Sequence, residues 1–456
     1  MTTVCGLFLL ASIALTGTIF KRRLLNPLLL FFSSFFFALI CYELGIWRDI
    51  LPGGGFSYSY AELLFVASVV AFFIGSVVVA LIAGNKKPSV LVQIDARESE
   101  GLYKMVWCLL ILSGISIASR YTTLLGRYSA PMTDISFVRY DYTRMIYHFG
   151  LLDSLAFTLN HLVVLDLGIL VAIRGVAKFK LVLVGSIVCI VLNDIAVGAA
   201  NQTFQLTTLF LITALLSYES LANRRIRWKQ VAQVFAVLAL VSVIVFAIFN
   251  WRKGRDLLAD PEALDTLLFY AGGNVASLSY FVDHPMPSPL PGRHVFGGLY
   301  ALANDFSSVF GSSFLAPVSQ AADKEYSAVF YEDSPYNTSI YVSYYYSDFG
   351  GIGAIVMSCV LGAVLTYFFF RALQRRTILD MQLSALLLYD VFCGIRGAGV
   401  FGGRYSWFVL FLLFAQRWWL PNRTKRRNAI APLKTACLYA GRAGDPAPVK
   451  AQTRLR

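Results

Sequence analysis

Apolar stretches of roughly 20 residues alternate with short polar joints along most of the chain. A helix needs about 20 apolar residues to cross the hydrocarbon core of a bilayer, because each residue adds about 1.5 Å to its length. The pattern therefore predicts about eleven membrane-spanning helices. Their predicted ranges are 3–20, 27–46, 61–83, 102–119, 151–173, 181–198, 203–220, 231–250, 350–370, 378–395 and 405–420.

One long break interrupts this pattern between Trp251 and Phe349. The predicted organisation is therefore eight spans in 1–250, a large loop in 251–349, three spans in 350–420 and a disordered basic tail in 421–456. Within the loop, 265–283 is apolar enough to enter the membrane. Its length and the Gly272-Gly273 pair favour a re-entrant or interfacial helix over a crossing one. Two membrane-crossing helices within 251–349 would keep the predicted orientation of the last three helices, and a single one would invert it.

Composition agrees with a membrane protein, since 57% of the residues are hydrophobic and only 14% are charged. Soluble domains contain about 25% charged residues. A membrane barrel would instead show alternating segments of about ten residues. The first apolar stretch precedes Lys21-Arg22-Arg23 and lacks a small-residue cleavage site, which predicts a retained helix. We expect an all-α polytopic integral membrane protein.

The net charge of +13 is explained by membrane topology and needs no nucleic-acid partner. Basic residues concentrate in alternate connections, and such connections face the cytoplasm. The N-terminus is then expected outside, the C-terminus in the cytoplasm, and 251–349 on the periplasmic side of a bacterial inner membrane. The basic connections contain Lys21-Arg22-Arg23, Lys86-Lys87, Arg174, Lys178, Lys180, Arg224, Arg225, Arg227, Lys229, Arg371, Arg375, Arg376 and the tail from Arg417.

Metal and nucleotide chemistry have no sequence support. Six of the seven cysteines fall inside apolar spans and no C-x-x-C pair occurs. This pattern is typical of cysteines that pack as small apolar residues and do not form disulfides or metal sites. The four histidines lack metal-ligand spacing, and no phosphate-binding loop of the G-x-x-x-x-G-K-[ST] type is present. We expect no cofactor and no metal.

Arginines in the predicted outer connections run against the charge bias and need a separate reason. A guanidinium binds phosphate oxygens with two parallel hydrogen bonds and stays charged at every relevant pH. Several arginines near the membrane surface would suit the diphosphate of a lipid. Ordinary phospholipid headgroups or nearby acids such as Asp134, Asp141 and Asp256 are the alternative partners. These outer arginines are Arg120, Arg127, Arg139, Arg144, Arg252, Arg255, Arg293, Arg396 and Arg404.

A tyrosine-rich segment, Tyr341 to Asp348, closes the long loop. Tyrosines at the mouth of a span often form an aromatic belt. The functional interpretation is a wall on which sugar rings stack, with Tyr345 in it and Asp348 as a general base near the lipid boundary.

Two further groups leave both a structural and a functional interpretation open. His294 follows Arg293 after four closely spaced prolines, which predicts a stiff turn or a catalytic contact. Asn160, His161 and Asp166 lie inside a predicted span. Ionisable groups in lipid are functional candidates, and an interhelical polar cluster is the alternative.

The many spans, the large outer loop before the last three helices and the segment from Asn337 through Tyr345, Asp348 and Gly350 to Gly353 resemble bacterial O-antigen polymerases of the Wzy type. This family also has an Arg-x10-Gly motif in outer loops, which Arg139 and Gly150 match. No such match occurs in the long loop, where the family pattern has a second one.

The resemblance implies a glycosyltransferase that joins oligosaccharide repeat units carried on undecaprenyl diphosphate, without metal. Its partners would be this lipid-linked oligosaccharide, membrane lipids and a chain-length-regulating co-polymerase. An O-antigen ligase, for which His294 is the discriminating residue, and a lipid-linked sugar flippase or transporter are the alternatives. The expected catalytic residues are Asp348, His294 and Arg293. The expected substrate-binding residues are Arg120, Arg139, Arg252, Arg255, Arg396, Arg404, Asn337 and Tyr345.

Overall fold

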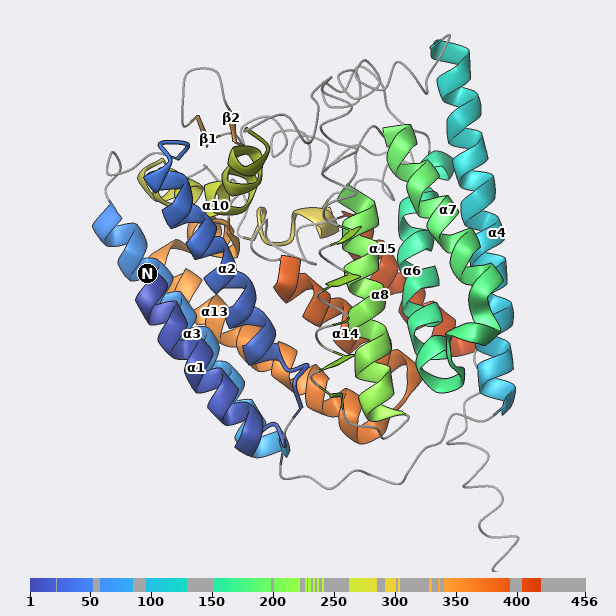
Figure 1. The fold of residues 1–456 in the computed structure, drawn as a ribbon, viewed down its shortest axis with the longest axis horizontal. Coiled ribbons are helices and arrows are strands. Elements are labelled where there is room, and N and C mark those ends of the chain that lie inside the picture. Colours follow the sequence, from blue (N-terminus) through green and yellow to red (C-terminus); the bar gives the residue numbers. More distant parts are fainter. Residues whose placement is uncertain are drawn as a thin grey trace, which may run out of the picture.

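A computed structural model shows the chain as an assembly of packed helices (Figure 1). The described residues are 1–21, 23–51, 58–84, 96–128, 151–197, 201–221, 226–227, 229–230, 233, 236–237, 240–241, 262–284, 292–300, 302–303, 328–329, 335–336, 340–393 and 404–419.

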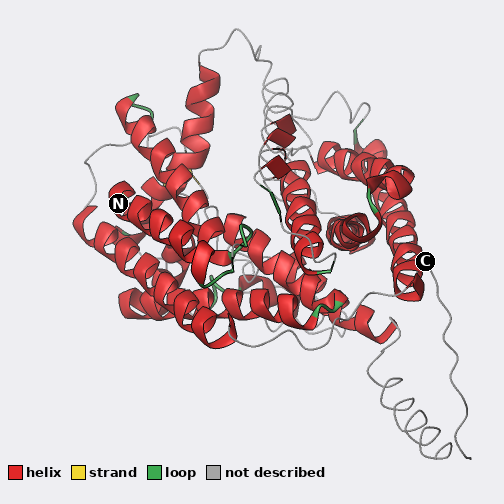
Figure 2. Cartoon of the chain, turned by 60° about the horizontal axis from the view of Figure 1, so that its bottom comes forward, coloured by secondary structure: helices red, strands yellow, loops and turns green. Residues whose placement is uncertain are grey.

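Helices make up nearly all of this described part (Figure 2). In it, β1 (Ala328–Val329) and β2 (Pro335–Tyr336) form a short antiparallel pair. The helices are α1 (Thr2–Thr18), α2 (Pro27–Trp47), α3 (Tyr58–Gly84), α4 (Ala96–Arg127), α6 (Leu151–Arg174), the 3-10 helix η1 (Val176–Phe179), α7 (Lys180–Val197), α8 (Asn201–Ser220), α10 (Glu262–Asp283), α13 (Tyr341–Arg375), α14 (Ile378–Cys393) and α15 (Arg404–Trp419).

Local signals in the sequence set several helix ends. Asn26 caps α2, because its side-chain oxygen accepts a hydrogen bond from the Leu29 amide at 3.0 Å. Pro27 then occupies the first position of that helix, where its missing N–H costs nothing. At the far end of α13, Arg376 adopts a left-handed conformation with φ of 55°, which stops the helix.

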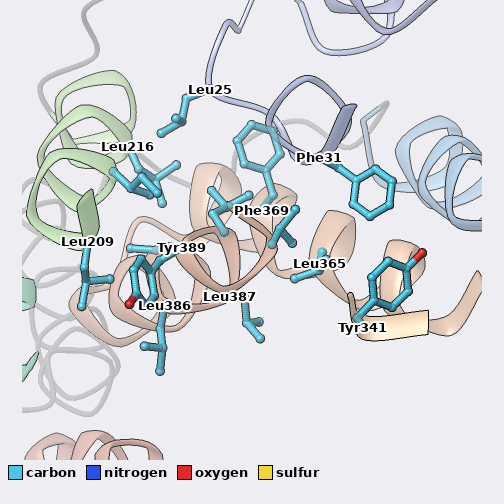
Figure 3. Close-up of a cluster of buried hydrophobic side chains, with 14 of the residues drawn as sticks. Leu25, Phe31, Leu209, Leu216, Tyr341, Leu365, Phe369, Leu386, Leu387 and Tyr389 are labelled. Carbon is cyan, nitrogen blue, oxygen red and sulfur yellow. The ribbon is translucent and has the colours of Figure 1, made fainter. Parts of the chain in front are cut away.

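The helices form two groups that α14 and α15 connect. One group contains α1, α2, α3, α10 and α13, and the other contains α4, α6, α7 and α8. Figure 3 shows how leucines of α14 lie between Leu209 and Leu216 of α8 and the side chains of α13. The larger hydrophobic cluster of the described residues therefore joins the two groups through α14.

Glycines allow α3 and α13 to pack closely. A Cβ atom added at Gly362 would collide with the Phe72 carbonyl oxygen, and one at Gly75 with that of Cys359. The Ser76 hydroxyl donates to the Gly362 carbonyl at 3.1 Å across the same contact. Small residues bring helices together in this way in membranes, where burial of apolar surface supplies little driving force.

The two ends of the bundle are defined by the helix ends that they hold (Figure 1). The basic end is the one at which α1, α3, α6 and α13 finish; Arg174 and Arg375 lie in the last turns of α6 and α13, and the Lys21 ammonium donates to the Gly84 carbonyl at 2.6 Å. The opposite end, called the Gly350 end, is the one at which α2 and α4 finish and α3 begins, and there Gly351 lies against Tyr60.

Six of the described helices are long and apolar enough to cross a membrane. Large apolar side chains also face outward, for example Leu63, which is 64% exposed, and Leu181, which is 72% exposed. An all-α, multi-pass membrane protein is therefore confirmed. The count of about eleven spans and their orientation stay predictions. The expected span 231–250 and the tail 421–456 lie mostly or wholly outside the described residues.

Helix α10 covers the segment expected to enter the membrane without crossing it. Near its start, Asp265 pairs with Arg48 just beyond α2 at 2.7 Å. At its other end, Asp283 lies within electrostatic range of Tyr346, which packs against Tyr60. Between these ends, Gly272 touches the backbone of Tyr42. Both ends of α10 therefore lie at the Gly350 end of the bundle. This arrangement favours a helix that is embedded in the membrane over one that crosses it.

Candidate functional site

Helix α13 is a hairpin of two arms that meet at Gly350. Gly350 has a φ of 69° and a ψ of −175°, which breaks the helix in a conformation that suits glycine. The hydroxyl of Tyr341 is next to Ser358, although 17 residues of straight helix would separate them by about 25 Å. The first arm, 341–349, therefore folds back along the second arm, 351–375.

The first arm begins inside the bundle. Ile340 and Val342 are 0% exposed and Tyr341 is 2% exposed. The Tyr341 ring lies 5.9 Å from that of Phe31, which stacks at 3.7 Å on Phe72 in the middle of α3. The start of this arm, at the end of the expected surface loop, thus lies within the bundle. Although this arm is rich in tyrosine, one of its faces packs against α2 and α3.

Tyr345 has a different place from the one expected of a sugar-stacking residue. It is 2% exposed, and its ring lies 5.3 Å from that of Tyr341 in the protein core. A residue so deeply buried stabilises the hairpin. The more open tyrosines of this arm are Tyr344 and Tyr346.

Asp348, the expected general base, binds main-chain amides. Its Oδ1 accepts a hydrogen bond from the His294 amide at 3.1 Å, and its Oδ2 accepts one from the Val295 amide at 2.7 Å. These bonds join the tip of the α13 hairpin to a turn at 292–296. They give Asp348 a structural task that the sequence did not reveal.

Arg293 lies in this turn and is 3% exposed. Its Nε and Nη2 atoms are buried and have no hydrogen-bond partner within the described residues. Leaving a buried charged donor unsatisfied costs more than the 1–3 kcal/mol typical of a neutral group. Such an atom pair is suited to a ligand that brings its own acceptors, and an anion with two oxygens fits a guanidinium best.

His294 is next to Arg293 and is half-buried. Two of the three expected catalytic residues are thus neighbours in one turn, and the third fixes that turn by hydrogen bonds. The structure therefore brings Arg293, His294 and Asp348 together at the Gly350 end.

Arg120 has a partner in the protein and lies within a helix. It is 3% exposed, and its Nη1 donates to Asn193 of α7, whose amide donates to Gln202 of α8. Helix α4 continues to Arg127, past the predicted start of the outer loop at 120. Arg120 thus ties three helices together, which is a structural task that the sequence did not reveal.

The other expected binding residues lie wholly or partly outside the described residues. Arg404 begins α15, but its side chain lies outside the described part. The remaining expected residues outside the described part are Arg139, Arg252, Arg255, Asn337 and Arg396.

A second polar cluster lies within the helices nearer the basic end. Asp166 of α6 is 0% exposed and accepts hydrogen bonds from the amides of Gln382 of α14 and Gln416 of α15, the latter at 2.8 Å. No cation pairs with Asp166 among the described residues. The sequence pointed to Asp166 but not to its two partners, although glutamines in apolar helices are themselves a usable signal.

We expect Asp166 to serve as an interhelical link, which a pair of substitutions tests. Asp166→Asn keeps the shape and the hydrogen bonds, since the facing amides can rotate, and should leave the melting temperature nearly unchanged. Asp166→Leu removes the acceptor of the Gln416 amide and leaves the Gln382 amide with its bond to the Gln416 side-chain oxygen at 3.1 Å, which should cost about 1–3 kcal/mol. Thermal unfolding of the purified protein in detergent measures both. Equal losses in the two variants would show that an ionised carboxylate is required.

Metal ligation finds no support in the described residues, where no group of three or more His, Cys, Asp or Glu side chains could hold an ion. The described residues at the Gly350 end include a buried guanidinium, an imidazole and main-chain amides. These groups can bind an anion, stabilise negative charge and accept a proton.

Fold and site together define a multi-pass helical membrane protein with a buried arginine in a turn beside a helical hairpin. No known protein family, curated protein or solved structure matches the chain. Its function must therefore be argued from the chemistry of these residues.

Proposed function

We propose that this protein is a bacterial inner-membrane glycosyltransferase that polymerises oligosaccharide repeat units carried on undecaprenyl diphosphate. The observation that carries the proposal is Arg293, a buried arginine with two unsatisfied donor atoms at the end of the bundle opposite the basic residues. By the charge bias that end faces the periplasm, where lipid-linked repeat units would be joined.

A diphosphate suits this arginine for geometric and energetic reasons. The planar guanidinium forms two parallel hydrogen bonds to phosphate oxygens, and burial strengthens them because water no longer competes. Since the group carries its charge permanently, it can stabilise the negative charge that develops on a departing diphosphate. A diphosphate is already a good leaving group, so the transfer needs no nucleotide.

The proposed step is a substitution at the first sugar of the donor glycan. The acceptor hydroxyl oxygen forms a bond to the anomeric carbon, while the bond from that carbon to the diphosphate oxygen breaks and its electron pair leaves with the diphosphate. The hydroxyl proton passes to His294, the half-buried imidazole beside Arg293. A co-polymerase that limits chain length would act on the same periplasmic side.

The saccharide profile of a strain lacking the gene tests this proposal. We expect long polymer to disappear while lipid A core carrying a single repeat unit remains, because ligation of one unit does not need the polymerase. Reintroducing the gene should restore the polymer. Loss of the single-repeat species as well would contradict a polymerase and would indicate a ligase or a flippase.

One observation favours the flippase or transporter as a second candidate. Asp166 is fully buried among helices, with only glutamine amides as described hydrogen-bond partners. Buried carboxylates of this kind occur in proton or ion pathways. The Asp166→Asn variant separates the two functions, because an ion pathway needs the titrating group whereas an interhelical link does not.

A further inference from the structure

We infer that Asp348 is a positioning residue for Arg293 and not the proton acceptor of the reaction. Its carboxylate holds the turn at 292–296 by the two amides that follow Arg293. The inference rests on the proposed function, because it assigns Asp348 a role in binding the diphosphate.

The turn has the geometry of a helix start that lacks a local cap. The Phe296 amide donates to the Gly292 carbonyl at 2.7 Å, and residues 297–300 continue as a helix. The amides of His294 and Val295 lie in the turn just before this helix, and both donate to Asp348, across 54 and 53 residues of sequence. Asp348 thus caps the turn from a distant part of the chain.

Gly292 allows the backbone to adopt this turn. Its φ is 77°, a conformation that side chains rarely adopt, and an added Cβ would lie 2.8 Å from the Phe296 ring. The same Cβ would lie 3.5 Å from Phe349, the residue after Asp348. The backbone at 292 therefore packs directly against the tip of the hairpin, and this contact and the Asp348 bonds act together.

The bonding of Asp348 argues against a role as base. Both carboxylate oxygens already accept main-chain hydrogen bonds, and taking up a proton would weaken or break at least one of them. The turn that carries Arg293 and His294 would then loosen during the reaction. A group that must stay bound to keep the site assembled is poorly suited to exchange protons in each cycle.

The charge of Asp348 is also kept apart from Arg293. No ion pair joins the two side chains in the described structure, although the carboxylate binds the two residues that follow the arginine. Asp348 therefore holds the main chain beside Arg293 without neutralising the guanidinium. The buried Nε and Nη2 atoms stay available to an anion.

A double-mutant cycle on binding of undecaprenyl diphosphate tests this inference. Purified protein in detergent is titrated with the lipid as wild type, Arg293→Ala, Asp348→Ala and the double variant. We expect Asp348→Ala to weaken binding about tenfold or more, and the double variant to bind no more weakly than Arg293→Ala, because Asp348 acts through the arginine. Asp348→Asn keeps one acceptor oxygen and should restore part of the affinity.

Asp265→Asn is the matched control. Asp265 lies at the same end and pairs with Arg48 in a half-exposed salt bridge, so its loss should leave lipid affinity unchanged. Melting temperatures of all variants show whether the fold is retained.

Three results would contradict the inference in distinguishable ways. Independent, additive losses in the double variant would show that Asp348 does not act through Arg293. Unchanged affinity in Asp348→Ala, with turnover strongly reduced and the acidic limb missing from the pH profile of the residual rate, would make Asp348 the base. Absence of lipid binding by the wild type, or equal binding by Arg293→Ala, would overturn the proposed diphosphate site together with this inference.

Discussion

Replacing Arg293 with alanine is expected to abolish long polymer without reducing the amount of protein in the membrane. Removing a preorganised donor to a developing negative charge typically lowers a rate 10²- to 10³-fold. Stability should not fall, because the two buried donor atoms of Arg293 lack partners in the described protein and their removal relieves a desolvation cost. Gel profiles of surface polysaccharide and immunoblots of membranes measure the two effects.

Arg293→Lys and Arg127→Ala sharpen this test. Lysine keeps the charge but loses the planar fork, so Arg293→Lys should retain partial polymerisation. Arg127 is an exposed arginine at the same end of the bundle, and its loss should leave polymer length unchanged. Normal polymer in the Arg293→Ala strain would remove Arg293 from the mechanism.

Replacing Gly362 with alanine is expected to destabilise the protein more than any other substitution proposed for it. The new Cβ atom would collide with the Phe72 carbonyl oxygen, and backbone cannot move aside as a flexible side chain can. Overpacking of this kind costs about 1–3 kcal/mol and sometimes more. We expect Gly362→Ala to lower the melting temperature in detergent and to reduce the yield of monodisperse protein, because α3 and α13 must separate.

Gly114→Ala is the control for this substitution. Gly114 lies in α4, and an added Cβ there would meet no atom within 4 Å. Alanine favours the helix by up to about 1 kcal/mol over glycine, so this variant should be neutral or slightly stabilised. Equal melting temperatures for the two variants would show that the close contact of α3 and α13 contributes nothing.

The long apolar helices could be predicted from the sequence because one physical rule governs them. Backbone polar groups must be satisfied within lipid, so each crossing segment is an apolar helix of a set length. The predicted range 61–83 corresponds to α3 at Tyr58–Gly84. The prediction for 350–370 located the second arm of α13 but missed the first, which begins at Tyr341.

The hairpin of α13 depends on tertiary structure and could not be read from hydrophobicity. Tyrosines and serines in 341–349 are typical of a membrane surface, and nothing local indicates that Tyr341 and Tyr345 pack inside the bundle. The reversal needs the backbone conformation of Gly350, and the sequence contains several other glycines nearby.

The candidate site was predicted in part. Sequence reasoning selected Arg293, His294 and Asp348, and the structure brings them together. Their separate roles were not accessible, because a carboxylate that binds distant amides looks the same in sequence as one that faces a substrate. The structural role of Arg120 could not be predicted either, because its partner Asn193 lies on another helix.

Reconstitution of the purified protein with its proposed substrate tests the central claim most directly. The measurement follows the length of glycan formed when wild-type protein, in liposomes, receives repeat units linked to undecaprenyl diphosphate without nucleotide or added metal. The account predicts a ladder of products that lengthens with time and is absent with Arg293→Ala. A wild-type protein that is folded and binds the lipid, yet leaves the single repeat unit unextended, would contradict it.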